Sequence, residues 1–217
     1  FTTQGSQAIA IGINSGQANQ GGASIAIGNQ AGLTSQGTQC IALGQQSGET
    51  TQGQYSVALG YQAGQARQGV NSVAIGQQPA VSDQGQDAVA IGTSAGSTTQ
   101  GYRSIAIGNQ AGQTSQATTA IGIGSLAGQL NQGTGAVALG FNAGLSAQGN
   151  YAVAIGASAG KTSQPANSIV INASGAVLSG AVASACYINP IRGVAAGAGV
   201  GRVLYDAATK ELYYSTT

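Results

Sequence analysis

The sequence predicts an all-β fold, a parallel β-solenoid built from eleven 16-residue coils. Two observations lead to this prediction. First, a pair of aliphatic residues, two positions apart, recurs at every sixteenth position of the chain up to about position 176, without insertion or deletion. Second, a glutamine recurs at the same spacing in every one of these rows. A row this short has no room for a helix-containing unit, whereas it suits one coil of a stack of short strands.

Each row predicts a short strand, a glycine turn, a second short strand and another turn. An aliphatic, small, aliphatic triplet has the period of two that is typical of a strand. Glycine follows the triplet in ten of the eleven rows, and an Ala-Gly pair such as 31–32 or 63–64 follows three residues later. Glycine supplies the backbone freedom that tight turns require.

The composition excludes several classes of function. The chain has 217 residues and no His, Met or Trp, and only 5 % of its residues are charged, with a net charge of +1. Without a basic patch it is unsuited to nucleic acid, and without imidazole and with few carboxylates it is unsuited to acid–base catalysis. A disordered low-complexity tract was the competing interpretation, but such a tract has no reason to keep a strict register.

We expect the aliphatic pairs to form the structural core of the coils. They are Ile9 and Ile11, Ile25 and Ile27, Ile41 and Leu43, Val57 and Leu59, Val73 and Ile75, Val89 and Ile91, Ile105 and Ile107, Ile121 and Ile123, Val137 and Leu139, Val153 and Ile155, and Ile169 and Ile171. Two large apolar residues per coil give little burial against the entropy of ordering a whole coil. We therefore expect a closed cyclic homo-oligomer, with a thin monomeric roll as the alternative.

The glutamines of the repeat predict a ladder of stacked side chains. Its members are Gln4, Gln20, Gln36, Gln52, Gln68, Gln84, Gln100, Gln116, Gln132, Gln148 and Gln164. The rare charges agree with the same register, because Arg67 and Asp83, and likewise Asp87 and Arg103, are separated by one full period of the repeat. Opposite charges in adjacent strands are mildly favourable, so both pairs are predicted to be ion pairs between neighbouring coils.

The repeats resemble a known family. Segments such as 72–76 (Ser-Val-Ala-Ile-Gly) and 104–108 (Ser-Ile-Ala-Ile-Gly), each followed by Ala-Gly or a similar pair, are similar to the head repeats of YadA-type trimeric adhesins. The resemblance covers residues 1–176, which is about four fifths of the chain. It implies a left-handed parallel β-roll that associates as a trimer about a common axis. The uniform 16-residue period with a glutamine in every row is more regular than the family pattern.

Residues 177–217 form the second predicted domain, a small C-terminal β cap or neck that ends in a hairpin. Solenoids require such caps at their ends. This region resembles the segment that precedes the endosialidase-type intramolecular chaperone in phage tail fibres and in fibre-like proteins of large DNA viruses. The matching residues are 187–192, 204–206 and 209–215. The resemblance implies a downstream chaperone that has been removed or truncated, with Thr217 near the processing point.

These observations favour a non-catalytic trimeric fibre or adhesin segment, most consistent with a viral or phage host-attachment fibre located on the virion or cell surface. The alternatives are a bacterial trimeric adhesin head, an ice-binding β-solenoid, which would need a regular Thr-x-Thr array, and a polysaccharide-degrading fibre, which would need paired carboxylates. We expect no catalytic residue, cofactor, metal, nucleic-acid partner or membrane insertion. The expected partners are two further copies of the chain and a host receptor or glycan.

Candidate surface contacts come from aromatic residues at positions that are polar in the other rows. They are Tyr55, Tyr61, Tyr102, Phe141 and Tyr151. Exposed aromatic rings stack on sugars or form centres of protein interfaces; the alternative is that they pack between subunits or over turns. Cys40 and Cys186 lie about nine coils apart, too far for a disulfide within one chain, so both are expected to be free thiols in packed positions.

Overall fold

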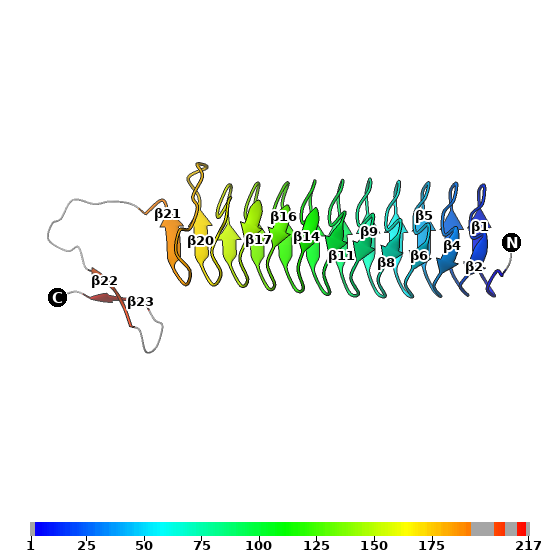
Figure 1. Ribbon diagram of the computed structural model, residues 1–217, viewed down its shortest axis with the longest axis horizontal. Helices are drawn as coiled ribbons and strands as arrows, with labels where there is room; N and C mark the ends of the chain where they lie inside the picture. The colour runs from blue at the N-terminus through cyan, green and yellow to red at the C-terminus, as the bar shows by residue number, and fades with distance from the viewer. Residues whose placement is uncertain (1–2, 192–201, 207–211, 216–217) are drawn as a thin grey trace.

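The computed structural model describes residues 3–191, 202–206 and 212–215. In this part of the chain the fold is an all-β solenoid, in which short parallel strands stack coil upon coil along one axis (Figure 1). Most coils contribute one strand to each of two parallel sheets. The predicted fold class is therefore confirmed at the level of the single chain.

The larger sheet has twelve parallel strands. Up to residue 171 each residue pairs with its equivalent in the next coil, as Ile105 does with Ile121. The strands are β1 (Ile9–Ile11), β3 (Ile25–Ile27), β5 (Ile41–Leu43), β7 (Val57–Leu59), β9 (Val73–Ile75), β11 (Val89–Ile91), β13 (Ile105–Ile107), β15 (Ile121–Ile123), β17 (Val137–Leu139), β19 (Val153–Ile155), β20 (Ile169–Asn172) and β21 (Cys186–Asn189).

The smaller sheet has nine parallel strands, and each of them ends at a glutamine of the repeat. They are β2 (Ala18–Gln20), β4 (Thr34–Gln36), β6 (Thr51–Gln52), β8 (Arg67–Gln68), β10 (Asp83–Gln84), β12 (Thr99–Gln100), β14 (Thr114–Gln116), β16 (Leu130–Gln132) and β18 (Ser146–Gln148). Isolated bridges from Gln4 to Gln20 and from Ser146 to Thr162 continue this sheet at both ends.

The interior of the solenoid is made largely of alanine, and the prediction that the aliphatic pairs form its core is wrong for the single chain. Apart from Ala10 in the first coil, the middle residue of each triplet, such as Ala106, is buried. None of the paired aliphatic residues is buried. Nine are exposed: Ile9, Ile11, Ile41, Leu43, Leu59, Leu139, Ile155, Ile169 and Ile171. Thirteen are half-buried: Ile25, Ile27, Val57, Val73, Ile75, Val89, Ile91, Ile105, Ile107, Ile121, Ile123, Val137 and Val153.

The narrow coil explains this orientation. Because the two sheets are joined by short turns, the space between them accepts side chains the size of alanine, together with one extended glutamine per coil. The fit is tight at Gly122, the one glycine in the middle of a triplet, where a Cβ atom would lie 2.8 Å from the Ala127 backbone oxygen. Isoleucine, leucine and valine at the outer positions of the triplet therefore face away from the interior.

The repeat glutamines fill the remaining interior space as the predicted ladder. Apart from Gln4, which lies exposed at the N-terminal end, they are buried. Each buried side chain crosses between the sheets: Gln116 Nε2 donates to the Ile105 oxygen at 2.7 Å and to the Ala120 oxygen at 3.3 Å. Amide-to-amide bonds join Gln116 to Gln132 at 3.1 Å, and similar bonds link other neighbours in the column. The bonds to the backbone oxygens give the buried amide nitrogens partners.

The glycine that follows ten of the eleven aliphatic triplets is favoured by both conformation and space. Gly108 has a φ of 128°, which side chains rarely adopt, and a Cβ atom there would lie 2.6 Å from the Gly124 oxygen in the next coil. Glycine is the residue that tolerates both constraints. This explains why the period of the repeat is kept so strictly, since an insertion would move a side chain into this contact.

The larger sheet continues beyond the predicted domain boundary at residue 176. Strand β21 pairs in parallel with β20, with Cys186 opposite Ile169, so the spacing between these two strands is one position longer than the repeat. The Tyr187 ring packs against the buried Val170 side chain at the end of the core. Its hydroxyl oxygen accepts hydrogen bonds from the Ala181 and Val182 amides at 3.1 and 2.9 Å. Strand β21 therefore extends the larger sheet to residue 189.

The hairpin predicted near the C-terminus is present as two antiparallel strands. Strand β22 (Arg202–Tyr205) pairs with β23 (Leu212–Ser215), with Leu204 opposite Tyr213. The predicted processing point at Thr217 lies outside the described residues.

Candidate interaction surfaces

An apolar face covers the outside of the larger sheet and is the most extensive candidate surface. We call it the aliphatic face; it consists of the first and third residue of each strand of the larger sheet from β1 to β20, continued by Cys186 and Ile188 of β21. The exposed fraction is 58 % for Ile11, 43 % for Leu139 and 45 % for Ile188. Extended apolar surfaces of this kind mark interaction sites in soluble proteins.

The aliphatic face also explains the position of the second cysteine. Both thiols are free, but only Cys40 is packed, with its Sγ donating to the Gly53 oxygen at 2.9 Å. Cys186 is exposed, contrary to expectation, because it occupies the outward column that Ile169 occupies in the preceding coil. The sequence indicates this placement, because Cys186 and Ile188 are two positions apart, as the aliphatic residues of a triplet are. They stand one position later than the repeat predicts.

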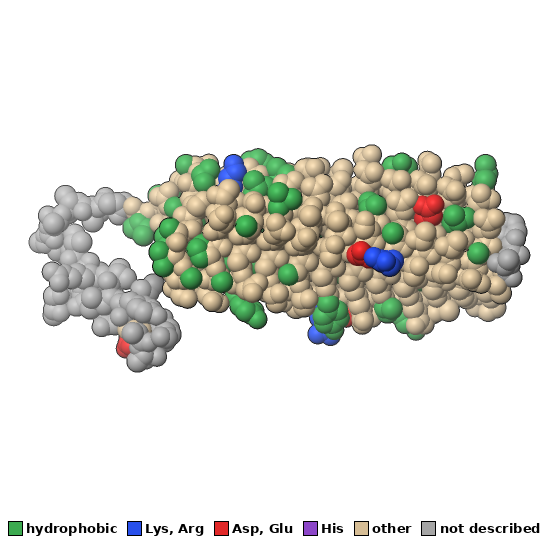
Figure 2. Space-filling view, viewed as in Figure 1, with side chains coloured by type: hydrophobic (Ala, Val, Ile, Leu, Met, Phe, Trp, Pro, Cys, Tyr) green, Lys and Arg blue, Asp and Glu red, His purple; other side chains and the backbone are tan. Residues whose placement is uncertain are grey.

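The rare charges lie in the predicted pairs. Arg67 and Asp83 are directly opposite each other in β8 and β10, and their side chains form an ion pair. Arg103 Nε lies 3.5 Å from Asp87 Oδ2, and Asp87 also accepts a hydrogen bond from Asn71 Nδ2 at 3.1 Å. Figure 2 shows how few charged side chains the visible face carries. The repeat region is therefore close to electrically neutral along its length.

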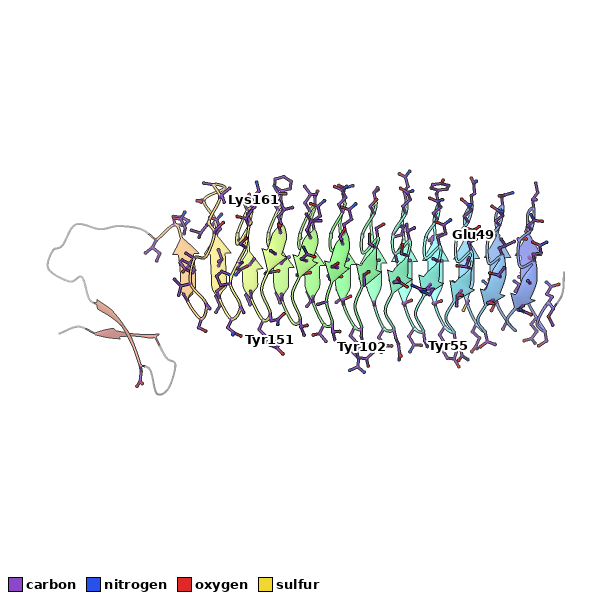
Figure 3. All side chains as sticks on the ribbon, in the orientation of Figure 1. Glu49, Tyr55, Tyr102, Tyr151 and Lys161 are labelled. Atoms are coloured by element: carbon purple, nitrogen blue, oxygen red, sulfur yellow. The ribbon has the colours of Figure 1, made fainter. Side chains whose placement is uncertain are left out.

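Three tyrosines lie along one edge of the solenoid (Figure 3). Tyr55, Tyr102 and Tyr151 belong to the turns that lead from the smaller sheet to the larger sheet. Their exposed fractions are 51, 38 and 62 %, respectively. We call this row of turns the tyrosine edge. The Arg103 guanidinium carbon lies 4.6 Å from the centre of the Tyr102 ring, in the range of a cation–π contact.

The other two aromatic candidates lie elsewhere. Tyr61 and Phe141 occur in the turns that follow strands of the larger sheet. Their exposed fractions are 41 and 55 %, respectively. All five candidate aromatics are therefore accessible in the single chain, but the fold does not bring them together. Sequence spacing already separates the two groups, because they occupy different columns of the repeat.

In the ranges 3–191, 202–206 and 212–215, no three His, Cys, Asp or Glu side chains come together as a possible metal site. No helix among these residues has the length and apolar character needed to cross a membrane.

Two segments of the solenoid match a known family model, that of the YadA head domain repeat. The matched residues are 84–111, which include strands β11 to β13, and 132–159, which include β17 to β19. Comparison with curated proteins and with solved structures gave no significant match. The solenoid therefore contains two segments that are similar to YadA head repeats.

Proposed function

We propose that this chain is a non-catalytic segment of a homotrimeric, adhesin-like fibre displayed on a surface. The aliphatic face is the observation that carries the proposal. Two outward aliphatic residues per coil, repeated along the whole larger sheet, remain partly exposed in the single chain. Three solenoids with these faces turned toward one axis would bury them, at a gain of about 25 cal/mol for each Å² removed from water. The match to YadA head repeats supports the threefold arrangement.

The composition of the interior supports this proposal. Alanine, serine and glutamine fill the core, so a lone coil removes little apolar surface from water. Ladder hydrogen bonds contribute only about 1 kcal/mol each after the loss of water. A closed cyclic assembly adds the missing apolar burial without leaving an unpaired interface.

Cross-linking at Cys186 tests which face is shared between copies. Because Cys186 lies on the aliphatic face, a short bifunctional thiol reagent should join two chains of the intact protein and give a denatured band of about twice 21.0 kDa. The variant C186S should remove the band, since Cys40 is buried. In the matched control C186S/S115C, the thiol lies on exposed Ser115 of β14 in the smaller sheet and should give no band. Cross-linking through residue 115 but not through 186 would contradict the proposal.

Within this class we propose a host-attachment fibre of a virus or phage, with a bacterial adhesin head as the alternative. The support is the resemblance of residues 187–192, 204–206 and 209–215 to the segment before an intramolecular chaperone. The full-length gene should then encode a self-cleaving chaperone downstream. A stop codon directly after Thr217, with no chaperone supplied by another gene, would contradict this assignment. The proposed location is the virion or cell surface, where a receptor or glycan is bound.

A further inference from the structure

The tyrosine edge has a regular spacing along the solenoid. Tyr55, Arg103 and Tyr151 occupy the same position of the repeat, in coils that are three apart, and Tyr102 directly precedes Arg103. With coils stacked about 4.8 Å apart, each tyrosine stands about 14 Å along the axis from the next one in the row. They thus form a straight row of exposed rings parallel to the long axis (Figure 3).

Folding of the single chain does not account for these rings. The residue at the position of Tyr55 and Tyr151 has a positive φ in every coil, so the turn of the repeat imposes the left-handed conformation, which bulky side chains disfavour. More than half of each residue nevertheless stays exposed, so little packing offsets this strain. The preceding coil makes room for one ring: a Cβ atom on Gly135 would lie 2.8 Å from Tyr151 Cδ1. Large exposed aromatic rings at a position of the turn that suits small polar residues or glycine point to a role in binding.

The groups between the rings define the chemistry of a partner. The backbone amides of Tyr55, Arg103 and Tyr151 already donate to the preceding coil, at 3.1, 3.0 and 2.9 Å. An added peptide strand would therefore find no free row of amides here. Most of the side chains between the rings are neutral amides or hydroxyls, among them Gln54, Gln86, Thr118, Thr134 and Asn150, and Val70 adds an exposed apolar group.

Charge along this edge is balanced. The Asp87 carboxylate and the Arg103 guanidinium pair with each other. The edge consequently offers neither the cationic surface that a polyanion needs nor an anionic one for a basic partner.

From this arrangement we infer that the tyrosine edge binds a linear, uncharged polysaccharide that lies along the solenoid. Sugar rings stack on Tyr55, Tyr102 and Tyr151, whose rings combine an apolar face with a hydroxyl tip. Amide and hydroxyl side chains between the rings bind the sugar hydroxyls, as both donors and acceptors. The inference rests on the proposed attachment function and deepens it by naming the class of receptor.

The test measures binding of the full chain to immobilised neutral polysaccharides (glucans, mannans and galactans) and to acidic polysaccharides. The wild type should bind a neutral polymer, more tightly as the polymer lengthens, and with little dependence on salt. The variant Y55S/Y102S/Y151S should bind at least about tenfold more weakly. Y55F/Y102F/Y151F should retain most of the binding because it keeps the rings. L130S, which removes an exposed leucine from the smaller sheet, should bind as the wild type does.

The native mass of each variant separates this inference from the proposed trimer. A serine variant that keeps the wild-type mass but loses binding supports the inference. Wild-type binding by the serine variant, preference for acidic polymers, or no binding of any neutral polymer overturns it. A lower mass of the serine variant than of the wild type also overturns it, because the tyrosines would then be subunit contacts. A wild type that is itself monomeric contradicts the trimer and leaves the binding comparison valid.

Discussion

The Gln116 side chain spans the interior of the solenoid, and its Nε2 atom donates to the Ile105 backbone oxygen 2.7 Å away. Gln116 belongs to the smaller sheet and Ile105 to the larger one, so this bond ties the two sheets together. Each of the other repeat glutamines from position 20 to position 164 donates the equivalent bond, to the carbonyl oxygen eleven residues before it. The glutamine column thus takes the structural place of a conventional apolar core.

Replacing Gln116 by alanine should destabilise the solenoid. The substitution removes the two hydrogen bonds that Gln116 Nε2 donates, to the Ile105 and Ala120 oxygens. At about 0.5–1.5 kcal/mol for each bond, the expected cost is about 1–3 kcal/mol. Urea unfolding followed by circular dichroism measures the loss in the free energy of unfolding. Gln39, which is exposed, provides the matched control Q39A, expected to have little effect. Equal effects of the two variants would show that the interior amides do not hold the sheets together.

Gly108→Ala should destabilise the fold through backbone strain. The new Cβ atom would lie 2.6 Å from the Gly124 oxygen at a φ of 128°, and such strain costs on the order of 1–3 kcal/mol. Gly22→Ala is the control, because its Cβ atom would have no neighbour closer than 3.5 Å. Thermal unfolding of the two variants provides the comparison. Indistinguishable melting temperatures would mean that successive coils do not approach as closely as described.

Removal of the Arg67–Asp83 ion pair should have only a small effect. The side chains are 72 and 42 % exposed, and exposed pairs contribute about 0–1 kcal/mol. The double variant R67Q/D83N should therefore unfold close to the wild-type urea concentration, with the difference shrinking further at high salt. A loss as large as that expected for Q116A would indicate that the pair holds the coils in register.

The strict period of the repeat made most of the fold predictable from the sequence. It gave the register of both sheets, the glutamine column and the partners of Arg67 and Asp87, because parallel in-register stacking places equivalent residues side by side. The direction of the aliphatic residues was not predictable in the same way. Period-two alternation shows that Ile105 and Ile107 share a face, but only the narrow width of the coil decides that this face is the outer one.

The end of the solenoid was predicted less well for a different reason. The offset between β20 and β21 is one position longer than the period of the repeat, so a search at that fixed period misses the added strand. For the candidate site, the sequence identified the tyrosines because they stand at positions that are polar in most other rows. Their common edge follows once the turns are placed, since Tyr102 and Tyr151 occupy adjacent positions of the repeat.

The native mass of the purified protein tests the central claim most directly. Burial of the aliphatic faces about one axis predicts a mass of three times 21.0 kDa, about 63 kDa. I105D/I107D, which places charges on this face, should lower the mass to that of the single chain, whereas S115D on the smaller sheet should leave it unchanged. A wild-type mass of 21.0 kDa, with the β circular dichroism signal intact, would contradict the account.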